Sequence, residues 1–475
     1  MLGWAVPADL VIHAARAVVE HTPGAAGSAG VDSATSAAGA AGDRASAERA
    51  VTLLVDGSVI IDVRPLNPQI RGEQTVTLAS DEVLLPGLVD THVHVNEPGR
   101  VEWEGFTTAT RAAAAGGVTT LVDMPLNSIP ATLDPPSLAV KRAAAAGQCT
   151  VDVGFWGGAV PGNLGRLGEL LDAGVFGVKC FLPDSGVAEF PALGPERLLD
   201  ACAELAEHDG LLLVHAEDPG ELAEAPPPSG PSYARFLDSR PARAEDIAVA
   251  AVLDAARRTG ARVHIVHLSS AGALPLVAQA KAQGVRVTVE TCPHYLVLAA
   301  EDVPDGATEV KCCPPVRDRA NQDALWRGLA EGVIDLVVSD HSPCTADLKC
   351  ADTGDFAAAW GGIAGLQLGL ALVWTAARAR PDRHDLGEVV RWMATGPAAL
   401  AGLRTKGAIR VGAAADLVVF APDEQVVVEP ARLHHRNPVS PYVGMRLAGA
   451  VRRTWLAGAP VGVDPRGRLL ARGEA

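Results

Sequence analysis

The chain has 475 residues, 48% of them hydrophobic and 20% charged, and its formal net charge at pH 7 is −16. These values are typical of a globular protein with one large domain and a smaller companion. The acidic balance, without a run of Lys or Arg, argues against a nucleic-acid-binding surface and favours a neutral or metal-held small-molecule substrate.

Cysteine usage and the N-terminal segment bear on the compartment. The eight cysteines form no Cys-x-x-Cys pair and no disulfide framework, so we expect reduced thiols and a cytoplasmic protein. The N-terminus lacks the basic start and apolar core of a secretion signal. No uninterrupted apolar stretch reaches the roughly 20 residues that span a bilayer. We therefore expect neither secretion nor membrane insertion.

Short strands are predicted near the N-terminus. They are rich in aliphatic and β-branched residues and lie at 9–12, 51–55, 59–63 and 74–78. Residues 23–46, between the first two strands, are rich in Ala, Gly and Ser and contain almost no large apolar residue. Such a segment cannot offset its ordering entropy by burial, so we predict a disordered insertion there.

From residue 86 onward, apolar strands alternate with Ala-rich helices. Eight strands are predicted, at residues 88–92, 119–124, 151–155, 177–181, 211–215, 262–267, 286–290 and 334–340. The helices predicted between them include residues 105–115, 137–146, 195–207, 243–258 and 274–283. Because parallel strands need a crossover that a helix usually supplies, this alternation predicts an α/β fold, a (β/α)8 TIM barrel.

The last part of the chain changes from helix back to strand. Helices are predicted at residues 363–379 and 386–393, and strands at 415–420 and 452–456. The two terminal β regions are each too small to fold alone, so we expect them to pair into one discontinuous β-sandwich domain. The predicted domains are residues 1–85 and 408–475, which form the small β domain, and the barrel at 86–407.

A His-x-His pair ends the first strand of the predicted barrel. The two-residue period of a strand places His92 and His94 on the same side, where two imidazoles can bind one metal ion. Alone this pair is weak evidence, because solvated or core histidines are the more common explanation.

Further metal-capable side chains fall at the carboxyl ends of predicted strands 4, 5, 6 and 8. They are Lys179, His215, His267 and Asp340. A barrel gathers those strand ends at one mouth, where barrel enzymes keep their chemistry. For any one of these residues a hydrogen-bonded core position remains the alternative, but the whole pattern indicates ligands of two divalent ions.

Lys179 needs a separate explanation, because an ammonium group has no lone pair to offer a metal. From spacing alone an ordinary salt bridge is the favoured interpretation. Burial near cations, however, can drive a lysine neutral, and a neutral amine can take up CO2 to form a carbamate. The carboxylate of that carbamate can bridge two metal ions.

These residues resemble the cyclic-amidohydrolase branch of the amidohydrolase superfamily, and within it the allantoinase family most. The matching segments are residues 87–94, 96–100, 103–105, 124–127, 290–295, 339–344, 360–367 and 440–444. The resemblance covers nearly the whole chain, and its main gap is the segment at 23–46.

The resemblance implies a binuclear metal centre. In it, His92 and His94 hold the more buried ion, usually zinc, and His215 and His267 hold the second. N-carboxylated Lys179 bridges the two ions, and Asp340 completes the first site. The implied reaction is attack of a shared hydroxide on a ring carbonyl, with Asp340 as general acid and base. The family also implies a homo-oligomer, commonly a tetramer.

The resemblance further implies the substrate. Dihydroorotases typically carry Arg where this chain has Asn96 and Asn where it has Cys313, and both of those residues bind a substrate carboxylate. Allantoin has none, and an unpaired buried charge would be costly, so the neutral side chains favour allantoin and a role in purine breakdown. Asn127, Thr291 and Cys292 are further candidate substrate-binding residues, or else turn and packing residues. Dihydropyrimidinase, hydantoinase and dihydroorotase activities stay open, as does a non-catalytic scaffold.

Other histidines and charges are not assigned to the metal centre. His341 follows the predicted aspartate ligand and would point away from the metals on a continuing strand. His294 lies in a loop and is a candidate to support the ligands. Residues 434–436 are expected on the surface. Glu97 and Arg100 either pair under the mouth or are loop residues.

Overall fold

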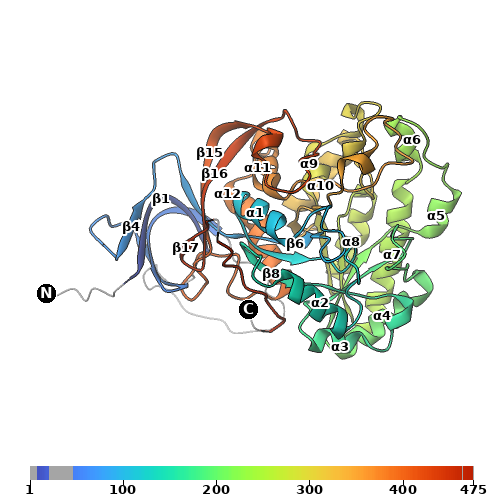
Figure 1. Ribbon diagram of the computed structural model, residues 1–475, viewed down its shortest axis with the longest axis horizontal. Helices are drawn as coiled ribbons and strands as arrows, with labels where there is room; N and C mark the ends of the chain where they lie inside the picture. Colours follow the sequence, from blue (N-terminus) through green and yellow to red (C-terminus); the bar gives the residue numbers. More distant parts are fainter. Residues whose placement is uncertain (1–7, 21–45, 463, 474–475) are drawn as a thin grey trace.

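The computed structural model describes residues 8–20, 46–462 and 464–473 of the chain. Figure 1 shows an α/β molecule, with a β sheet at one side and, beside it, parallel strands surrounded by helices. Of the predicted insertion at residues 23–46, only Ser46 belongs to the described part, as the first residue of a strand. The prediction of disorder therefore falls outside the described residues.

The central strands pair in parallel. They are β6 (Leu88–Val93), β7 (Val118–Asp123), β8 (Asp152–Phe155), β9 (Gly157–Gly158), β10 (Val178–Phe181), β11 (Leu211–His215), β12 (Arg262–Ile265), β13 (Val287–Thr291) and β14 (Leu336–Val337). Their ladders run β6-β7-β8 and β9 to β14. β9 follows β8 after a single intervening residue and pairs with β10, which links the two ladders. At the other end, a parallel bridge between Val93 and His341 joins the segment after β14 to β6. The pairing therefore returns to its first strand.

Helices cover these strands, as parallel sheets require. The longer helices are α1 (Phe106–Ala115), α2 (Pro135–Ala145), α4 (Pro195–Glu207), α7 (Ala242–Thr259), α8 (Leu274–Ala282), α10 (Arg319–Ala330) and α11 (Gly369–Ala379). The shorter ones are α3 (Leu167–Asp172), α5 (Pro219–Glu224), α6 (Tyr233–Asp238), α9 (Pro293–Val297), α12 (Leu386–Val390) and α13 (Gly396–Ala401). None of the helices in the described part of the chain combines the length and hydropathy of a bilayer-spanning segment.

The sequence explains why these elements form. Every residue of β6, β7 and β10 is buried, in keeping with their nearly continuous apolar and β-branched composition. α4 shows the helical counterpart, since it buries Leu198, Ala201, Cys202 and Leu205, which fall on one face at spacings of three and four residues.

The predicted strands at 262–267 and 334–340 and the predicted helix at 363–379 are at least two residues shorter in the structure. The strand predicted at 262–267 ends at Ile265, and the ladder predicted at 334–340 contains only Leu336–Val337. The extended backbone stops because His267 and Asp340 adopt positive φ angles of 36° and 43°. The helix predicted from residue 363 begins only at Gly369, because Ile363 makes a parallel bridge to His341.

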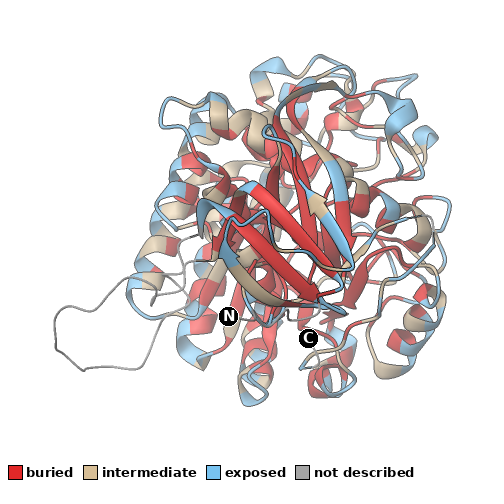
Figure 2. Ribbon diagram, turned by 90° about the vertical axis from the view of Figure 1, so that its left-hand side faces the viewer, coloured by how far each residue is buried: buried red, intermediate tan, exposed pale blue. Residues whose placement is uncertain are grey.

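Strands from both ends of the chain lie in one sheet. They are β1 (Leu10–Glu20), β2 (Ser46–Asp56), β3 (Val59–Pro65), β4 (Gln74–Thr77), β5 (Val83–Pro86), β15 (Leu417–Val427), β16 (Arg446–Leu456) and β17 (Ala459–Pro460). The order is β17-β16-β15-β5-β1-β2-β3, and β4 pairs with β1. β5 therefore joins the two ends of the chain through its pairing with β15 and β1. Figure 2 shows this sheet facing the viewer; β1 and β5 are mostly buried, whereas β3 and β4 are largely exposed or half-buried.

Candidate functional site

The six predicted ligands meet at the carboxyl ends of the parallel strands. His92 lies in β6, Lys179 in β10 and His215 at the end of β11. The Nε2 atom of His92 lies 3.1 Å from Nζ of Lys179 and 3.1 Å from Oδ1 of Asp340. The Nε2 atom of His94 is 3.5 Å from the same carboxylate oxygen. One half of the site is thus two imidazoles, an amine and a carboxylate.

The other two histidines form the second half. Nδ1 of His215 lies 3.0 Å from Nε2 of His267. The ring of His267 is 5.4 Å from that of His92, measured between centroids. His92, His267 and Asp340 each offer a ligand atom within 4.8 Å of the other two. The two halves are therefore one continuous cluster.

The backbone conformation of Asp340 and His267 orients their side chains. Asp340 and His267 both have positive φ angles, of 43° and 36°. Residues other than glycine adopt this region at a cost of about 1–3 kcal/mol, and such strain tends to gather at functional sites. Here the turn at the end of each strand directs the side chain into the cluster.

Glu290 fixes the orientation of His92. Its carboxylate contacts Nδ1 of His92 and lies 2.8 Å from Nε2 of His264. Burial alone would raise the pKa of Glu290, but the rings of His92 and His264 lower that pKa well below its usual range. The ionised carboxylate accepts the Nδ1 proton of His92, which leaves the Nε2 lone pair directed into the cluster.

Glu217 does the same for His215. Its carboxylate lies 2.7 Å from Nε2 of His215 and also contacts the guanidinium of Arg240. Although burial raises the pKa of Glu217, the charge of Arg240 and the bond to His215 bring that pKa well below its usual range. Nδ1 of His215 is thereby left free to face His267.

The electrostatics of the cluster fit a metal centre. Burial lowers the pKa of His94 to about 3 and that of Lys179 to about 8, so the imidazole is neutral and the amine deprotonates easily. Burial opposes ionisation of Asp340, but His92 and its neighbours bring the pKa of this carboxyl well below its usual range. Nδ1 of His94 and of His267 are buried without a hydrogen-bond partner among the described residues. Neutral imidazoles and a carboxylate are the donors that zinc and similar divalent ions take.

A cavity of about 270 Å³ opens onto this cluster. Five of the six predicted ligands line it, namely His94, Lys179, His215, His267 and Asp340. Asn127 and Cys313, two of the candidate substrate-binding residues, line it too. The cavity therefore gives a small molecule access to the cluster.

The remaining candidate substrate-binding residues are buried and are not among the lining residues. The amide of Asn96 donates to the carbonyl of Pro343 at 3.3 Å, and Oγ1 of Thr291 donates to the carbonyl of Leu268 at 2.9 Å. Cys292 is fully buried behind the cavity wall. A role of these three residues in substrate binding therefore stays a prediction.

The sequence did not point to several residues of the cavity wall. Arg240 and Lys311 line the cavity, as does the segment at 359–362, which includes Trp360. Nζ of Lys311 donates to the carbonyl of Ala359 at 2.5 Å, and Nζ of Lys349 donates to that of Trp360 at 3.0 Å. These contacts arise from the tertiary fold, so no spacing of residues in the sequence predicts them.

The other histidines and charges can now be placed. His341 points away from the cluster, as predicted, with Nε2 lying 3.1 Å from Glu104. Of the two alternatives for Glu97 and Arg100, the structure does not show the ion pair between them. Glu97 accepts a hydrogen bond from the backbone of Phe106, while Arg100 contacts Glu189.

The prediction that residues 434–436 lie on the surface is wrong for His435, which is only 3% exposed. His434 and Arg436 are exposed, and the backbone N–H of Arg436 donates to Glu104 at 3.1 Å. The segment folds back onto the residues before α1, a long-range contact that local sequence does not reveal.

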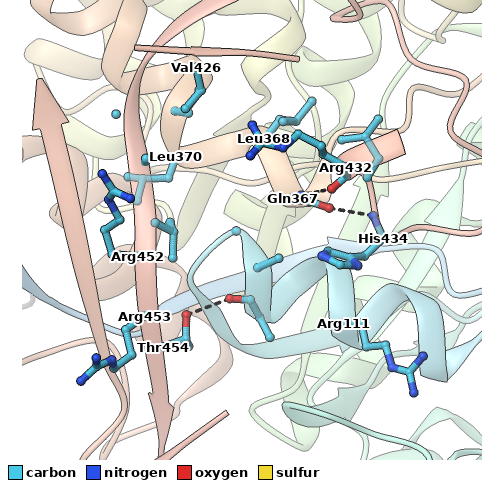
Figure 3. Close-up of a pocket in the computed structure, with 18 of the residues that line it drawn as sticks. Arg111, Gln367, Leu368, Leu370, Val426, Arg432, His434, Arg452, Arg453 and Thr454 are labelled. Carbon is cyan, nitrogen blue, oxygen red and sulfur yellow. Dashed lines mark hydrogen bonds between the residues drawn. The ribbon is translucent and has the colours of Figure 1, made fainter. Parts of the chain in front are cut away.

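A second and larger hollow, of about 630 Å³, lies between α1, β15 and β16 (Figure 3). Its wall carries Arg111, Arg432 and Arg452, and Gln367 bonds the backbone of Arg432 and His434. Both groups of described residues that are able to hold a metal ion lie elsewhere, around Asp340. Size alone therefore does not make this hollow the reactive site.

Comparison with known proteins identifies one family and several relatives that carry the same name. The amidohydrolase family matches residues 83–461. The chain is 58% identical over 429 residues to an allantoinase from Streptomyces avermitilis, covering 89% of this chain and 95% of that relative. It is 46% identical over 420 residues to an allantoinase from Saccharomyces cerevisiae, covering 87% and 90%.

Solved structures of related enzymes are similar to this chain over nearly its whole length. An L-hydantoinase (dihydropyrimidinase) from Arthrobacter aurescens matches with a TM-score of 0.85 at 25% identity, covering 98% of this chain and 100% of that one. A dihydropyrimidinase from Brevibacillus agri matches with a TM-score of 0.82 at 28% identity, covering 97% and 98%.

Proposed function

The chain belongs to the amidohydrolase family, and from this membership we propose that it is an allantoinase, which hydrolyses the hydantoin ring amide of allantoin to give allantoate. The observation that carries the proposal is the meeting of four histidines, a lysine and an aspartate beside a cavity of about 270 Å³. Relatives that carry the name allantoinase at 58% and 46% identity support the choice of substrate.

We further propose that the fold is a (β/α)8 barrel at residues 86–407 with a discontinuous β-sandwich domain from residues 1–85 and 408–475. The return of parallel pairing from β14 to β6, through Val93 and His341, supports a closed barrel. The pairing of β5 with β15 supports a terminal domain built from both ends of the chain.

The proposed cofactor is a pair of divalent ions, most simply zinc. His92, His94 and Asp340 would hold one ion and His215 and His267 the other, with Lys179, N-carboxylated by CO2, shared between them. The low pKa of the buried Lys179 amine supports its carboxylation, because only the neutral amine reacts with CO2. When bound, such ions acidify a water molecule and polarise an amide carbonyl.

Asp340 is the proposed general acid and base. Its carboxylate is ionised and lies at the cavity wall, so it can accept a proton from the attacking water. It then passes that proton to the ring nitrogen as the carbon–nitrogen bond breaks. Glu290 holds the proton of His92 on Nδ1, and Glu217 holds that of His215 on Nε2. Nε2 of His92 and Nδ1 of His215 therefore stay unprotonated during the reaction.

The cavity wall suits an uncharged substrate. Besides the predicted ligand Lys179, the wall carries two basic side chains, and both are already engaged, since Arg240 contacts Glu217 and Lys311 donates to the carbonyl of Ala359. Asn127 and Cys313 add neutral polar groups. A substrate carboxylate would therefore meet no free partner among the described lining residues, and its desolvation would be costly.

Turnover of a substrate panel tests the proposal. Purified enzyme, expressed with zinc and bicarbonate, is assayed with allantoin, dihydroorotate, dihydrouracil and unsubstituted hydantoin. We expect the highest kcat/KM for allantoin. A higher kcat/KM for dihydroorotate or dihydrouracil would overturn the substrate assignment while leaving the metal chemistry intact. Less than one metal ion per chain, together with no turnover, would favour a non-catalytic scaffold.

The assembly and compartment are also proposals. We propose a homo-oligomer, most simply a tetramer, in the cytoplasm. The eight free cysteines support a reducing compartment. Light scattering coupled to gel filtration measures the mass of the assembly, and a monomeric mass would contradict the proposed oligomer.

A further inference from the structure

His294 is a buried histidine that the proposed reaction does not use. It lies in α9 immediately after β13 and is 1% exposed. Both of its ring nitrogens are buried without a hydrogen-bond partner among the described residues. Burial of an unpaired imidazole costs free energy, so a ligand for one nitrogen would stabilise this arrangement.

Two further donors lie beside this ring. The ligand atoms of Cys292, His294 and Asp340 all lie within 4.8 Å of one another, and all three side chains are buried. This group shares only Asp340 with the group formed by His92 and His267. Of the three donors only Asp340 lines the cavity, so a cation in the cavity meets this carboxylate first.

The donor set selects a class of cation. A thiolate, an imidazole and a carboxylate together favour zinc, cadmium and other thiophilic ions over magnesium or calcium. A cation is bound by the neutral imidazole and by the thiolate, so coordination replaces the S–H bond of Cys292 by a sulfur–metal bond and releases one proton to solvent.

We propose that Cys292, His294 and Asp340 form a further, inhibitory metal site that captures a thiophilic divalent cation present in excess over the catalytic ions. A cation held there occupies lone pairs of Asp340 and withdraws its carboxylate from proton transfer. The inhibition rests on the proposed role of Asp340, whereas the binding itself does not depend on which amide is the substrate.

Cadmium titration of the metal-loaded enzyme tests the site. Enzyme freed of excess metal is titrated with cadmium while thiolate-to-cadmium charge-transfer absorption, released protons and total bound metals are measured. We expect one additional equivalent of cadmium per chain, one released proton and the absorption band, with full retention of the resident ions. Activity should fall in step with the band. Failure to bind the additional equivalent would overturn the proposal.

Matched variants identify the thiol. Cys292→Ser should remove the band and raise the half-inhibiting cadmium concentration by at least about tenfold, since the loss of even an outer partner of a ligand has that effect. His294→Gln should raise the same concentration but keep the band. Cys312→Ser and Cys313→Ser are the controls, because both of these thiols line the cavity.

The same variants distinguish the proposed site from a cation site elsewhere. A band that survives in Cys292→Ser, or that disappears in Cys312→Ser or Cys313→Ser, would place the cation elsewhere and reject the proposed site. Stoichiometry and absorption are read without substrate, so they hold even where allantoin proves to be the wrong substrate. Additional cadmium that binds at Cys292 without loss of activity would reject the inhibitory role.

Discussion

Lys179 shows how folding changes the chemistry of a single residue. Its amine is buried beside Nε2 of His92, at 3.1 Å, and lies 5.0 Å from the ring centre of Phe181. Burial lowers the pKa of this amine to about 8, which makes the neutral form accessible near physiological pH. The neutral form is what carboxylation and metal binding need.

Replacement of Lys179 should remove metal and activity together. Lys179→Ala deletes the proposed bridging carboxylate, so we expect loss of bound metal and of allantoin turnover. Added short-chain carboxylic acids should restore part of both, because they can occupy the vacated position. Metal analysis and turnover measure the outcome.

Lys141 supplies the control for that experiment. It is equally buried but pairs with Asp123 at 2.7 Å, outside the cluster. Carboxylic acids should therefore not restore any function that Lys141→Ala loses. Full activity of Lys179→Ala without added acid would refute the carboxylated bridge.

Glu217 offers a second test at the residue scale. Glu217→Gln keeps the size of the side chain but removes the charge that orients His215, so metal affinity should fall about 10- to 100-fold. The chelator concentration that removes half of the metal measures this change. Glu221→Gln, which affects an outer pair with Arg243, should leave that concentration unchanged. Equal effects of the two substitutions would contradict an orienting role for Glu217.

Among the secondary-structure elements, the segment between β15 and β16 covers loops beside the cluster of predicted ligands. Arg436 donates to the carbonyl of Glu104 at 2.7 Å, and Ser440 donates to that of Ala364 at 2.7 Å. Within this segment His435 is buried, and its ring centroid lies 5.4 Å from that of His341. The segment therefore stabilises the loops that carry the site.

His435 should make this region sensitive to acid. Burial lowers its pKa from 6.5 to about 3, so the folded protein binds fewer protons than the unfolded chain between these values. Stability contributed by neutral His435 is complete above pH 6.5 and decreases as the pH falls below it, by about 1.4 kcal/mol per pH unit.

Urea unfolding at two pH values measures this effect. Between pH 7.5 and pH 5.5 the free energy of unfolding should fall by about 1 kcal/mol more in the parent protein than in His435→Gln. His434→Gln, at the exposed neighbouring position, is the matched control and should behave like the parent. Parallel curves for the parent and His435→Gln would show that His435 does not carry the pH dependence.

At the scale of the whole molecule, Lys406 joins the terminal sheet to the central strands. Its Nζ lies 2.7 Å from Asp152 in β8 and 2.6 Å from Asp416, next to β15. The lysine is 5% and the aspartates at most 4% exposed. One buried ammonium thus neutralises carboxylates from both parts of the fold.

Removal of this ammonium should be costly. Lys406→Met removes the buried cation from Asp416 and leaves Asp152 only its 3.5 Å pair with the exposed Arg468, so we expect a loss of about 3–5 kcal/mol in the free energy of unfolding. Lys281→Met, which breaks a partly exposed pair with Asp335, should cost about 1 kcal/mol or less. Urea unfolding compares the two variants, and similar losses would contradict a special role for Lys406.

Much of the architecture was predictable because its signals are local. The parallel strands are continuous apolar runs, and the helices carry apolar residues three and four positions apart. The strand ends were the weaker predictions, since positive φ angles at His267 and Asp340 stop the extended backbone earlier than composition suggests.

The amino-acid sequence was enough to predict the alternation of strand and helix and the residue types that can hold two metal ions, because periodicity and side-chain chemistry are properties of the local chain. The groups that surround those residues depend on the three-dimensional packing of the whole chain. Glu217 meets Arg240, Lys311 meets Ala359, and His435 is buried against residues nearly a hundred positions away. Such contacts arise when loops from separate strands pack at one mouth, and no short-range pattern encodes them.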